Sequence, residues 1–181
     1  MHIQEGIKTI MTGQDLSREE ISSVMNQILT GSASEAQIGA FLVSLSIKGE
    51  SVDEVIGSAQ VMRKLSSKVS VDKVNLVDTC GTGGVGSGIF NVSTTAAFVA
   101  SSCGAKVAKH GNRSATRKSG SADLLEAAGV ALDLNPDQIK TCIEEVGLGF
   151  MFAPVHHSAM KHAVGPRKEL AIKTIFNLLG P

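Results

Sequence analysis

The sequence predicts an α/β protein in which a small all-helical domain, residues 1–70, precedes a mostly parallel α/β domain, residues 71–181. Residues 14–66 carry three successive helical patterns of apolar residues and no strand pattern. From Val71 onward, short apolar segments alternate with helical ones, and this order is typical of a parallel sheet covered by helices. A glycine-rich run, residues 81–88, follows the first short apolar segment.

Each helix of the first domain starts with a capping-box pattern, in which a serine precedes a Glu or Gln by three positions. The three pairs are Ser17 with Glu20, Ser34 with Gln37, and Ser51 with Glu54. Gly31 and Gly49 close the first two helices, as glycine commonly does.

The second domain is predicted to contain three strands and four helices. The expected strands are 74–77, 106–109 and 150–152, and the expected helices are 93–102, 122–128, 135–146 and 167–179. The segment 167–180 is expected to pack back on the helical domain. In sheets of this kind, ligands bind at the carboxyl ends of the strands.

Composition excludes several classes of protein. The 17 basic and 17 acidic residues balance, and the chain has neither Trp nor Tyr, which argues against a nucleic-acid binder. No apolar run approaches the ~18 residues of a membrane span, and the polar start is not that of a signal peptide. Cys80, Cys103 and Cys142 lack CxxC spacing and indicate reduced thiols in a cytoplasmic protein.

The stretch between Thr79 and Ala122 contains no Asp or Glu. It does contain His110 and five fixed positive charges, which are Lys106, Lys109, Arg113, Arg117 and Lys118. Together with the exposed N–H groups of the glycine run, these cations predict a site for a phosphate-rich anion.

Other interpretations of the glycine run fit less well. A dinucleotide fingerprint requires an acidic residue about 20 positions further on, and none occurs before Asp123. A P-loop requires Gly-Lys-Ser/Thr, whereas Ile89 and Phe90 follow this run. An ordinary glycine turn would not explain the helix-start pattern at residues 91–94.

The spacing of the histidines at 156, 157 and 162 fits no zinc site.

Several motifs, in order and spacing, resemble those of the anthranilate phosphoribosyltransferase family over nearly the whole chain. They are Asp78-Thr79-Cys80-Gly81-Thr82-Gly83-Gly84, Phe90-Asn91-Val92-Ser93-Thr94, Lys109-His110-Gly111-Asn112-Arg113, Gly120-Ser121-Ala122-Asp123, Phe152-Ala153-Pro154 with His156-His157, Gly165-Pro166-Arg167, and residues 174–181.

The resemblance implies a nucleoside phosphorylase/phosphoribosyltransferase type of fold and a glycosyltransferase of tryptophan biosynthesis. The amine of anthranilate would attack C1 of phosphoribosyl pyrophosphate (PRPP), releasing pyrophosphate and giving N-(5-phosphoribosyl)anthranilate. Catalysis would rest on fixed donors, cations and Mg²⁺ rather than on a nucleophilic side chain. The resemblance also implies a homodimer formed through the helical domain.

The resemblance assigns binding roles residue by residue. The residues implied to contact PRPP are Gly81, Gly83, Gly84, Val85, Asn91, Val92, Ser93, Thr94, Lys109, His110, Gly111, Asn112, Arg113, Ser114, Ala115, Thr116, Arg117 and Ser121. Those implied to contact anthranilate are Gly81, His110, Asn112, His157 and Arg167, with Arg167 bound to the carboxylate. Ser93 would also help to hold a magnesium ion.

The chain departs from the family pattern at several positions. Val85 stands where Asp is usual, Ile89 where Thr is usual, and Thr116 and Arg117 where two serines are usual. The family also continues for about as long again, with an Asp-Glu pair that binds magnesium. We therefore expect an α/β domain that is incomplete at the C-terminus and, in the 181-residue chain alone, an inactive enzyme.

Two rival functions follow from the same residues. The glycine run with Val85 also resembles that of pyrimidine nucleoside phosphorylases, although Asp78-Thr79-Cys80 precedes it where that family has Lys-His-Ser. The second rival is a non-catalytic fragment, a phosphate-binding or helical interaction module whose partner supplies the missing half.

Overall fold

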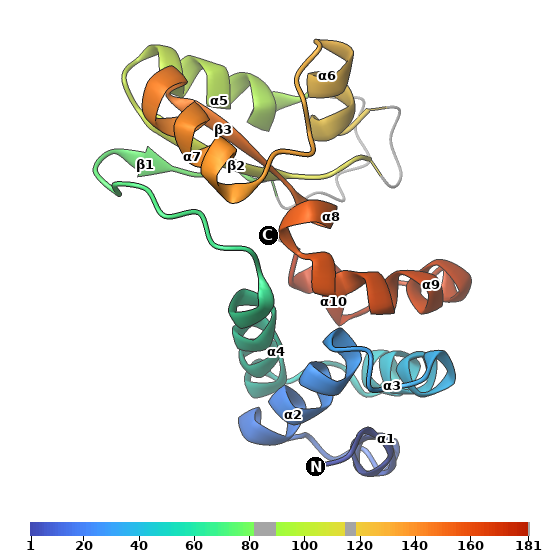
Figure 1. Cartoon of the computed structure of the whole chain (residues 1–181). Helices are drawn as coiled ribbons and strands as arrows, with labels where there is room; N and C mark the ends of the chain where they lie inside the picture. The colour runs from blue at the N-terminus through green and yellow to red at the C-terminus, as the bar shows by residue number, and fades with distance from the viewer. Residues whose placement is uncertain (82–89, 115–118, 181) are drawn as a thin grey trace. The chain divides into compact units, whose positions relative to one another are not determined.

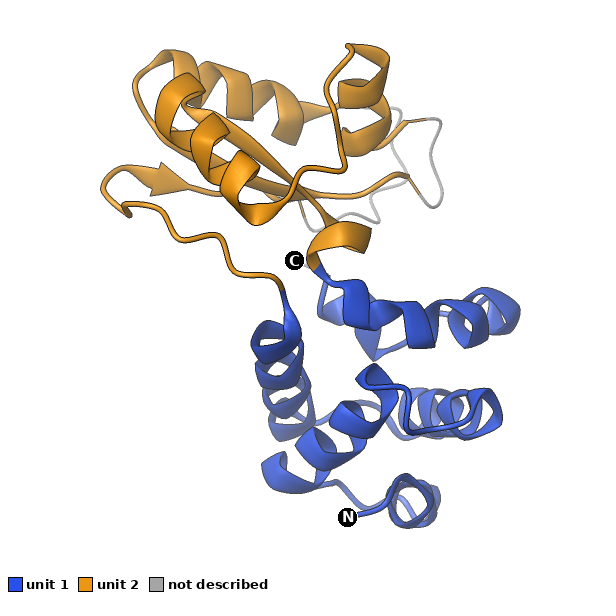
Figure 2. Cartoon of the chain, in the orientation of Figure 1, with its two compact units in different colours: residues 1–66, 157–181 blue, residues 67–156 orange. Residues whose placement is uncertain are grey.

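The computed structural model of the protein describes residues 1–81, 90–114 and 119–180 (Figure 1). The chain forms two compact units (Figure 2). Unit 1 comprises residues 1–66 and 157–181, and unit 2 comprises residues 67–156. The C-terminal residues thus cluster with the helical N-terminal residues, and the α/β elements form the unit between them in sequence.

Unit 1 is helical. Its elements are α1 (Ile3–Met11), α2 (Arg18–Leu29), α3 (Glu35–Lys48), α4 (Val52–Leu65), η2 (Ser158–Met160), α9 (Lys161–Leu170) and α10 (Ile175–Leu178). The three predicted helices are confirmed as α2, α3 and α4, each with the predicted capping box. Helix α1 was not predicted, because His2 with Glu5 is a less familiar capping pair.

The core of unit 1 lies where α1 packs on α3, α2 packs on α4, and α9 packs on α2 and α3. Apolar residues at helical spacing fill this core, because one face of each helix has to be removed from water. The largest buried side chains include Ile3, Ile21, Met25, Phe41 and Leu42.

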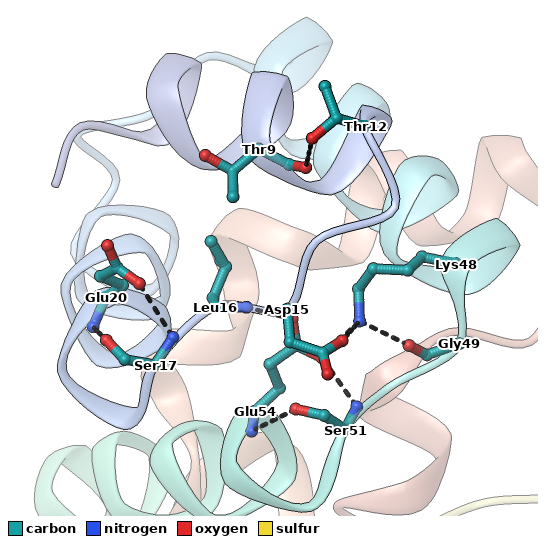
Figure 3. Close-up of polar contacts among 10 residues, drawn as sticks. All are labelled: Thr9, Thr12, Asp15, Leu16, Ser17, Glu20, Lys48, Gly49, Ser51 and Glu54. Atoms are coloured by element: carbon teal, nitrogen blue, oxygen red, sulfur yellow. Dashed lines mark hydrogen bonds and ion pairs between the residues drawn. The ribbon is translucent and has the colours of Figure 1, made fainter.

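A buried charged network joins three segments of unit 1 (Figure 3). The fully buried carboxylate of Glu54 accepts hydrogen bonds from Leu16 N (3.0 Å), Ser51 N (2.7 Å) and Lys48 Nζ (2.9 Å). Lys48 also binds Asp15 Oδ1 at 2.5 Å. Burial alone would lower the pKa of Lys48, but its contacts with Asp15 and Glu54 outweigh burial and raise the pKa. Glu54 therefore fixes the α1–α2 loop against the start of α4.

The prediction of one C-terminal helix over 167–179 was wrong. Helix α9 begins earlier, at Lys161, and ends at Leu170, because Ala171 adopts a left-handed conformation (φ 52°). Helix α10 starts after Thr174, whose N–H donates to Asn177 Oδ1 at 2.9 Å. A new capping pair therefore separates two short helices in a segment whose apolar pattern alone looked continuous.

Unit 2 contains a parallel sheet in the order β1-β2-β3, with strands β1 (Leu76–Val77), β2 (Lys106–Gly111) and β3 (Leu148–Phe152). The three predicted strands and their parallel pairing are confirmed, with Val77 opposite Val107 and Val107 opposite Leu148. The parallel order brings the carboxyl ends of β1 and β2 to the same edge of the sheet.

The helices of unit 2 are α5 (Val92–Ser102), α6 (Ser121–Ala127), α7 (Pro136–Thr141) and α8 (Ala153–His156). The predicted helix 135–146 forms as α7 continued by a π-helical turn, η1 (Cys142–Val146), which ends at the left-handed Gly147. Val107 and Phe150 of the sheet and Leu125 and Ile143 of the helical segments are buried. No helix among the described residues of either unit is long and apolar enough to cross a membrane.

Candidate functional site

The end of β1, the end of β2 and the start of α5 meet at one edge of the sheet in unit 2. The ammonium of Lys109 donates to Ser93 Oγ (3.3 Å), to the Thr79 carbonyl oxygen (3.4 Å) and to Thr79 Oγ1 (3.5 Å). The Thr79 hydroxyl in turn donates to the Ser93 carbonyl oxygen at 2.9 Å. The fold thus brings together two residues predicted to bind PRPP, Lys109 and Ser93, and adds Thr79.

Lys109 is almost completely buried, with 1% of its surface exposed. Burial lowers the pKa of its ammonium, and the negative charge of Asp78 only partly offsets this effect. Within residues 1–81, 90–114 and 119–180, Lys109 forms no ion pair with a carboxylate, and its ammonium donates to neutral oxygens. A buried cation held in this way is incompletely compensated, which favours an anionic ligand.

Asp78 organises the same edge, and sequence reasoning missed this role. Its Oδ1 accepts hydrogen bonds from Cys80 N (2.9 Å) and His110 N (3.3 Å), which ties the chain after β1 to β2. Burial raises the pKa of the Cys80 thiol, and Asp78 raises it further. Cys80 is therefore protonated near neutral pH, which does not suit a nucleophile.

The start of α5 is fixed by its own side chains. Asn91 Oδ1 accepts hydrogen bonds from Thr94 Oγ1 (2.8 Å) and Thr94 N (3.4 Å), so Asn91 is the N-cap of the helix. Val92 is exposed at this helix start. A Cβ atom added to Gly81 would lie 3.8 Å from Ser93 Oγ, which shows how closely the chain after β1 approaches the helix.

The predicted residues after β2 pack against the start of α6. A Cβ atom on Gly111 would lie 2.8 Å from Phe150 Cε2 and 3.1 Å from Ser121 Cβ, so only glycine fits without displacement. Asn112 Oδ1 accepts from Arg113 N at 2.7 Å, and the Asn112 carbonyl oxygen accepts from Ala122 N at 3.2 Å. Main-chain N–H groups thus bind both the side-chain oxygen and the carbonyl oxygen of Asn112.

Arg113 is engaged by carboxylates that lie outside the acid-free stretch of the sequence. Its guanidinium binds Glu126 through two hydrogen bonds (2.5 and 2.8 Å) and Asp123 at 3.4 Å. The contact with Glu126 is the main reason that the pKa of Arg113 is raised. The acid-free stretch led us to expect cations that face no competing carboxylate. This is wrong for Arg113, because α6 supplies two carboxylates, and for Lys106, whose ammonium pairs with Asp72 Oδ2 at 3.3 Å.

His110 lies beside His156, with ring centroids 6.0 Å apart and an interplanar angle of 61°. Burial lowers the pKa of both imidazoles. At His110 the negative charge of Asp78 partly offsets burial, whereas at His156 the charges of His110 and Lys68 lower the pKa further. Both rings are therefore mostly neutral at pH 7, which suits packing against a ligand better than binding its phosphates.

Two of the residues predicted to bind anthranilate, His157 and Arg167, belong to unit 1, and the others belong to unit 2. Arg167 is partly buried, and burial lowers its pKa. Its Cζ lies 5.3 Å from the ring centroid of Phe176. No carboxylate among the described residues of the chain forms an ion pair with Arg167.

Six of the predicted PRPP ligands lie outside the described residues. They are Gly83, Gly84, Val85, Ala115, Thr116 and Arg117. In the part of the chain that the structure describes, no three His, Cys, Asp or Glu side chains gather in a way that could hold a metal ion.

Comparison with known proteins also divides the chain into two domains, but its a/b-domain match includes residues 157–181, which belong to unit 1 in the structure. Residues 4–66 match the "Glycosyl transferase family, helical bundle domain", and residues 73–181 match the "Glycosyl transferase family, a/b domain". The boundary between the two matches lies close to the boundary between residues 66 and 67 in the structure.

Relatives and solved structures agree with the motif resemblance. An anthranilate phosphoribosyltransferase of Hahella chejuensis is 60% identical over all 181 residues, which correspond to 52% of that protein. The crystal structure of the Thermus thermophilus enzyme of that name superposes with a TM-score of 0.89 at 45% identity, over 97% of this chain and 54% of that one. The Saccharomyces cerevisiae enzyme in complex with PRPP and Mg superposes with a TM-score of 0.87 at 28% identity, over 99% of this chain and 54% of that one.

The chain spans about half the length of the curated relatives it matches. The resemblance to anthranilate phosphoribosyltransferases is confirmed, and the pyrimidine nucleoside phosphorylase alternative is not favoured. Because the a/b-domain match alone covers more than half of the chain, the protein belongs to this glycosyl transferase family.

Proposed function

We propose that the protein takes part in transfer of the phosphoribosyl group of PRPP to the amine of anthranilate. The buried Lys109 ammonium beside Ser93, at the carboxyl edge of a parallel sheet, is the observation that carries this proposal. The name of the relatives and the PRPP complex of the yeast neighbour support the choice of substrates.

In this reaction the anthranilate nitrogen forms a bond to C1 of the ribose while the bond from C1 to the pyrophosphate oxygen breaks. The amine then loses a proton, and pyrophosphate leaves with the bonding electron pair. A buried cation and fixed hydroxyl groups would stabilise the charge that develops on the leaving group. Lys109 would supply the cation, and Ser93 and Thr79 would orient it.

The carboxylate of anthranilate would bind Arg167. A guanidinium that is partly removed from water and forms no ion pair with a described carboxylate favours a carboxylate ligand. Asn112, whose main chain is fixed by α6, is a further residue that the motif resemblance assigns to anthranilate.

The described residues do not by themselves fit a resident magnesium ion. Ser93 Oγ offers one hydroxyl oxygen, and it lies 3.3 Å from the Lys109 ammonium, which would repel a divalent cation. Magnesium usually binds to carboxylates together with substrate phosphates. We propose that magnesium would bind only together with PRPP, whose phosphates would offset the charge of Lys109, with Ser93 as one ligand, and we assign no chemical step to the metal.

We further propose a cytoplasmic homodimer formed through unit 1. Ala36, Ala40 and Ile47 lie on one face of α3 at spacings of four and seven residues and are exposed, Ile47 by 82%. Such an apolar face is typical of a surface that a second subunit covers. The free thiols Cys80, Cys103 and Cys142 suit a reducing compartment.

The test is an assay of the protein at the full length that its gene encodes. Loss of anthranilate fluorescence in the presence of PRPP and Mg²⁺ is expected, with no phosphorolysis of thymidine. Thymidine phosphorolysis without anthranilate consumption would instead select the phosphorylase function. The 181-residue chain alone should bind PRPP without turnover, and turnover by this chain would refute the expectation that it is inactive.

A further inference from the structure

Arg113, Asp123 and Glu126 form a clasp between the chain after β2 and the first turns of α6. We propose that this clasp positions Asn112 and Ser121 for ligand binding, with Asp123 as its centre, and that Arg113 serves the clasp rather than contacting PRPP. The proposal rests on the proposed function for the identity of the ligand, but the clasp can be tested without it.

Asp123 joins two segments through main-chain contacts. Its Oδ2 accepts hydrogen bonds from Gly120 N at 2.7 Å and from Ser114 N at 3.0 Å. These two N–H groups are the main reason that the pKa of Asp123 is lowered. One carboxylate oxygen therefore holds together residues that are six positions apart in sequence.

Both terminal nitrogens of the Arg113 guanidinium are already engaged by carboxylates. It binds Glu126 with both terminal nitrogens and Asp123 with one of them, and its Cζ lies 5.6 Å from the centroid of the Phe152 ring. The three side chains together carry one net negative charge, which does not attract a phosphate. A PRPP phosphate that took the edge of Arg113 formed by its two terminal nitrogens would have to displace the bidentate contact with Glu126.

The main chain around the clasp is closely packed. A Cβ atom on Gly120 would lie 2.5 Å from Ser114 N and 2.8 Å from the Asn112 carbonyl oxygen. Ala122 N donates to that same carbonyl oxygen at 3.2 Å. A displacement of Asp123 would consequently move the chain on both sides of it, including Asn112 and Ser121.

The clasp is expected to act locally. Between 31% and 54% of each of its three side chains is exposed, and ion pairs with this exposure contribute little to global stability. Its test must therefore measure local opening, which hydrogen exchange of individual amides reports. Ser114 N and Gly120 N are the two amides that Asp123 protects directly.

The experiment compares Asp123→Asn, Glu126→Gln, Arg113→Glu and the charge swap Arg113→Glu/Glu126→Arg in the 181-residue chain. Glu144→Gln is the matched control, because Glu144 forms an exposed ion pair with Lys140 (3.9 Å) elsewhere in unit 2. Amide exchange is measured by NMR, and PRPP affinity by titration calorimetry.

We expect Asp123→Asn to accelerate exchange at Ser114 and Gly120 and to weaken PRPP binding, each about tenfold, because the groups act as one network. Glu126→Gln should weaken PRPP binding. The charge swap should recover most of the amide protection and PRPP affinity that Arg113→Glu loses. The control Glu144→Gln should change neither the exchange rates nor the affinity. Unchanged exchange in Asp123→Asn would overturn the clasp.

Tighter PRPP binding by Glu126→Gln would also overturn the proposal, since it would mean that Glu126 competes with PRPP for Arg113. If the charge swap recovers neither the amide protection nor the PRPP affinity, the pairing of Arg113 with Glu126 does not position Asn112 and Ser121. If PRPP fails to bind even the unsubstituted chain while Asp123→Asn still accelerates exchange, the clasp stands and the proposed function fails.

Discussion

The ammonium of Lys109 lies 3.3 Å from the hydroxyl oxygen of Ser93, although 16 positions separate the two residues in sequence. Lys109 stands near the end of β2, and Ser93 stands in the first turn of α5. Because α5 connects β1 to the neighbouring parallel strand β2, the topology itself produces this contact. The result is a buried cation among neutral oxygens, which is the centre of the proposed PRPP site.

The lowered pKa of Lys109 predicts a pH dependence of anion binding. The ammonium must be protonated to attract an anion, so affinity should fall as pH rises through a value below the ordinary lysine pKa of 10.5. Sulfate is a suitable probe because its own charge does not change in this range. Calorimetric titration of sulfate at a series of alkaline pH values measures the effect. Affinity that stays constant up to the ordinary lysine pKa would argue against this role.

Arg167→Ala should raise the KM for anthranilate far more than that for PRPP in the full-length protein. Truncation of one partner of a desolvated charge pair costs about 2–5 kcal/mol, and Arg167 would pair with the substrate carboxylate. Arg167→Lys is the control that keeps the charge but loses the planar fork, so its effect should be intermediate. Steady-state kinetics with each substrate varied in turn separates the two constants. Equal weakening of both substrates would be inconsistent with the assignment.

Glu54→Gln should destabilise unit 1 by about 3 kcal/mol, because it breaks a buried ion pair and leaves the Lys48 ammonium poorly compensated. Asp15→Asn is the matched control: its carboxylate is 63% exposed, so the loss should be below about 1 kcal/mol. Urea unfolding followed by circular dichroism gives both values. Similar losses for the two variants would show that burial of Glu54 does not dominate the network.

The helices and strands could be predicted wherever the signal is local. Ser17, Ser34, Ser51 and Asn135 each precede a Glu or Gln by three positions, and each begins a helix in the structure. The end of α9 at Ala171 could not be predicted in this way. There a residue in the left-handed conformation interrupts an apolar pattern that is continuous in the sequence. Nothing in the residue type signals this break, because alanine ordinarily favours helix.

The candidate site was predictable only in part, for a physical reason. Lys109 and Ser93 were expected at the site because their motifs are local and resemble a known family. Asp78 and the carboxylates that bind Arg113 lie outside the acid-free stretch, and the sheet and α6 bring them to residues within it. Charge counted along a sequence cannot reveal such pairing, because it is set by the fold.

The central claim, that Lys109 is the cation of a PRPP site, is tested most directly by titrating PRPP with Mg²⁺ into the chain and into Lys109→Met. Methionine keeps nearly the length of the side chain and removes the charge together with the ammonium's hydrogen bonds to Ser93 and Thr79. We expect the chain to bind PRPP and the variant to lose at least about tenfold in affinity, since a hydrogen bond to a charged group contributes about 1.5–3 kcal/mol. The variant should be at least as stable to heat, because it no longer buries an incompletely compensated charge. Equal affinity of the two proteins for PRPP would contradict the account.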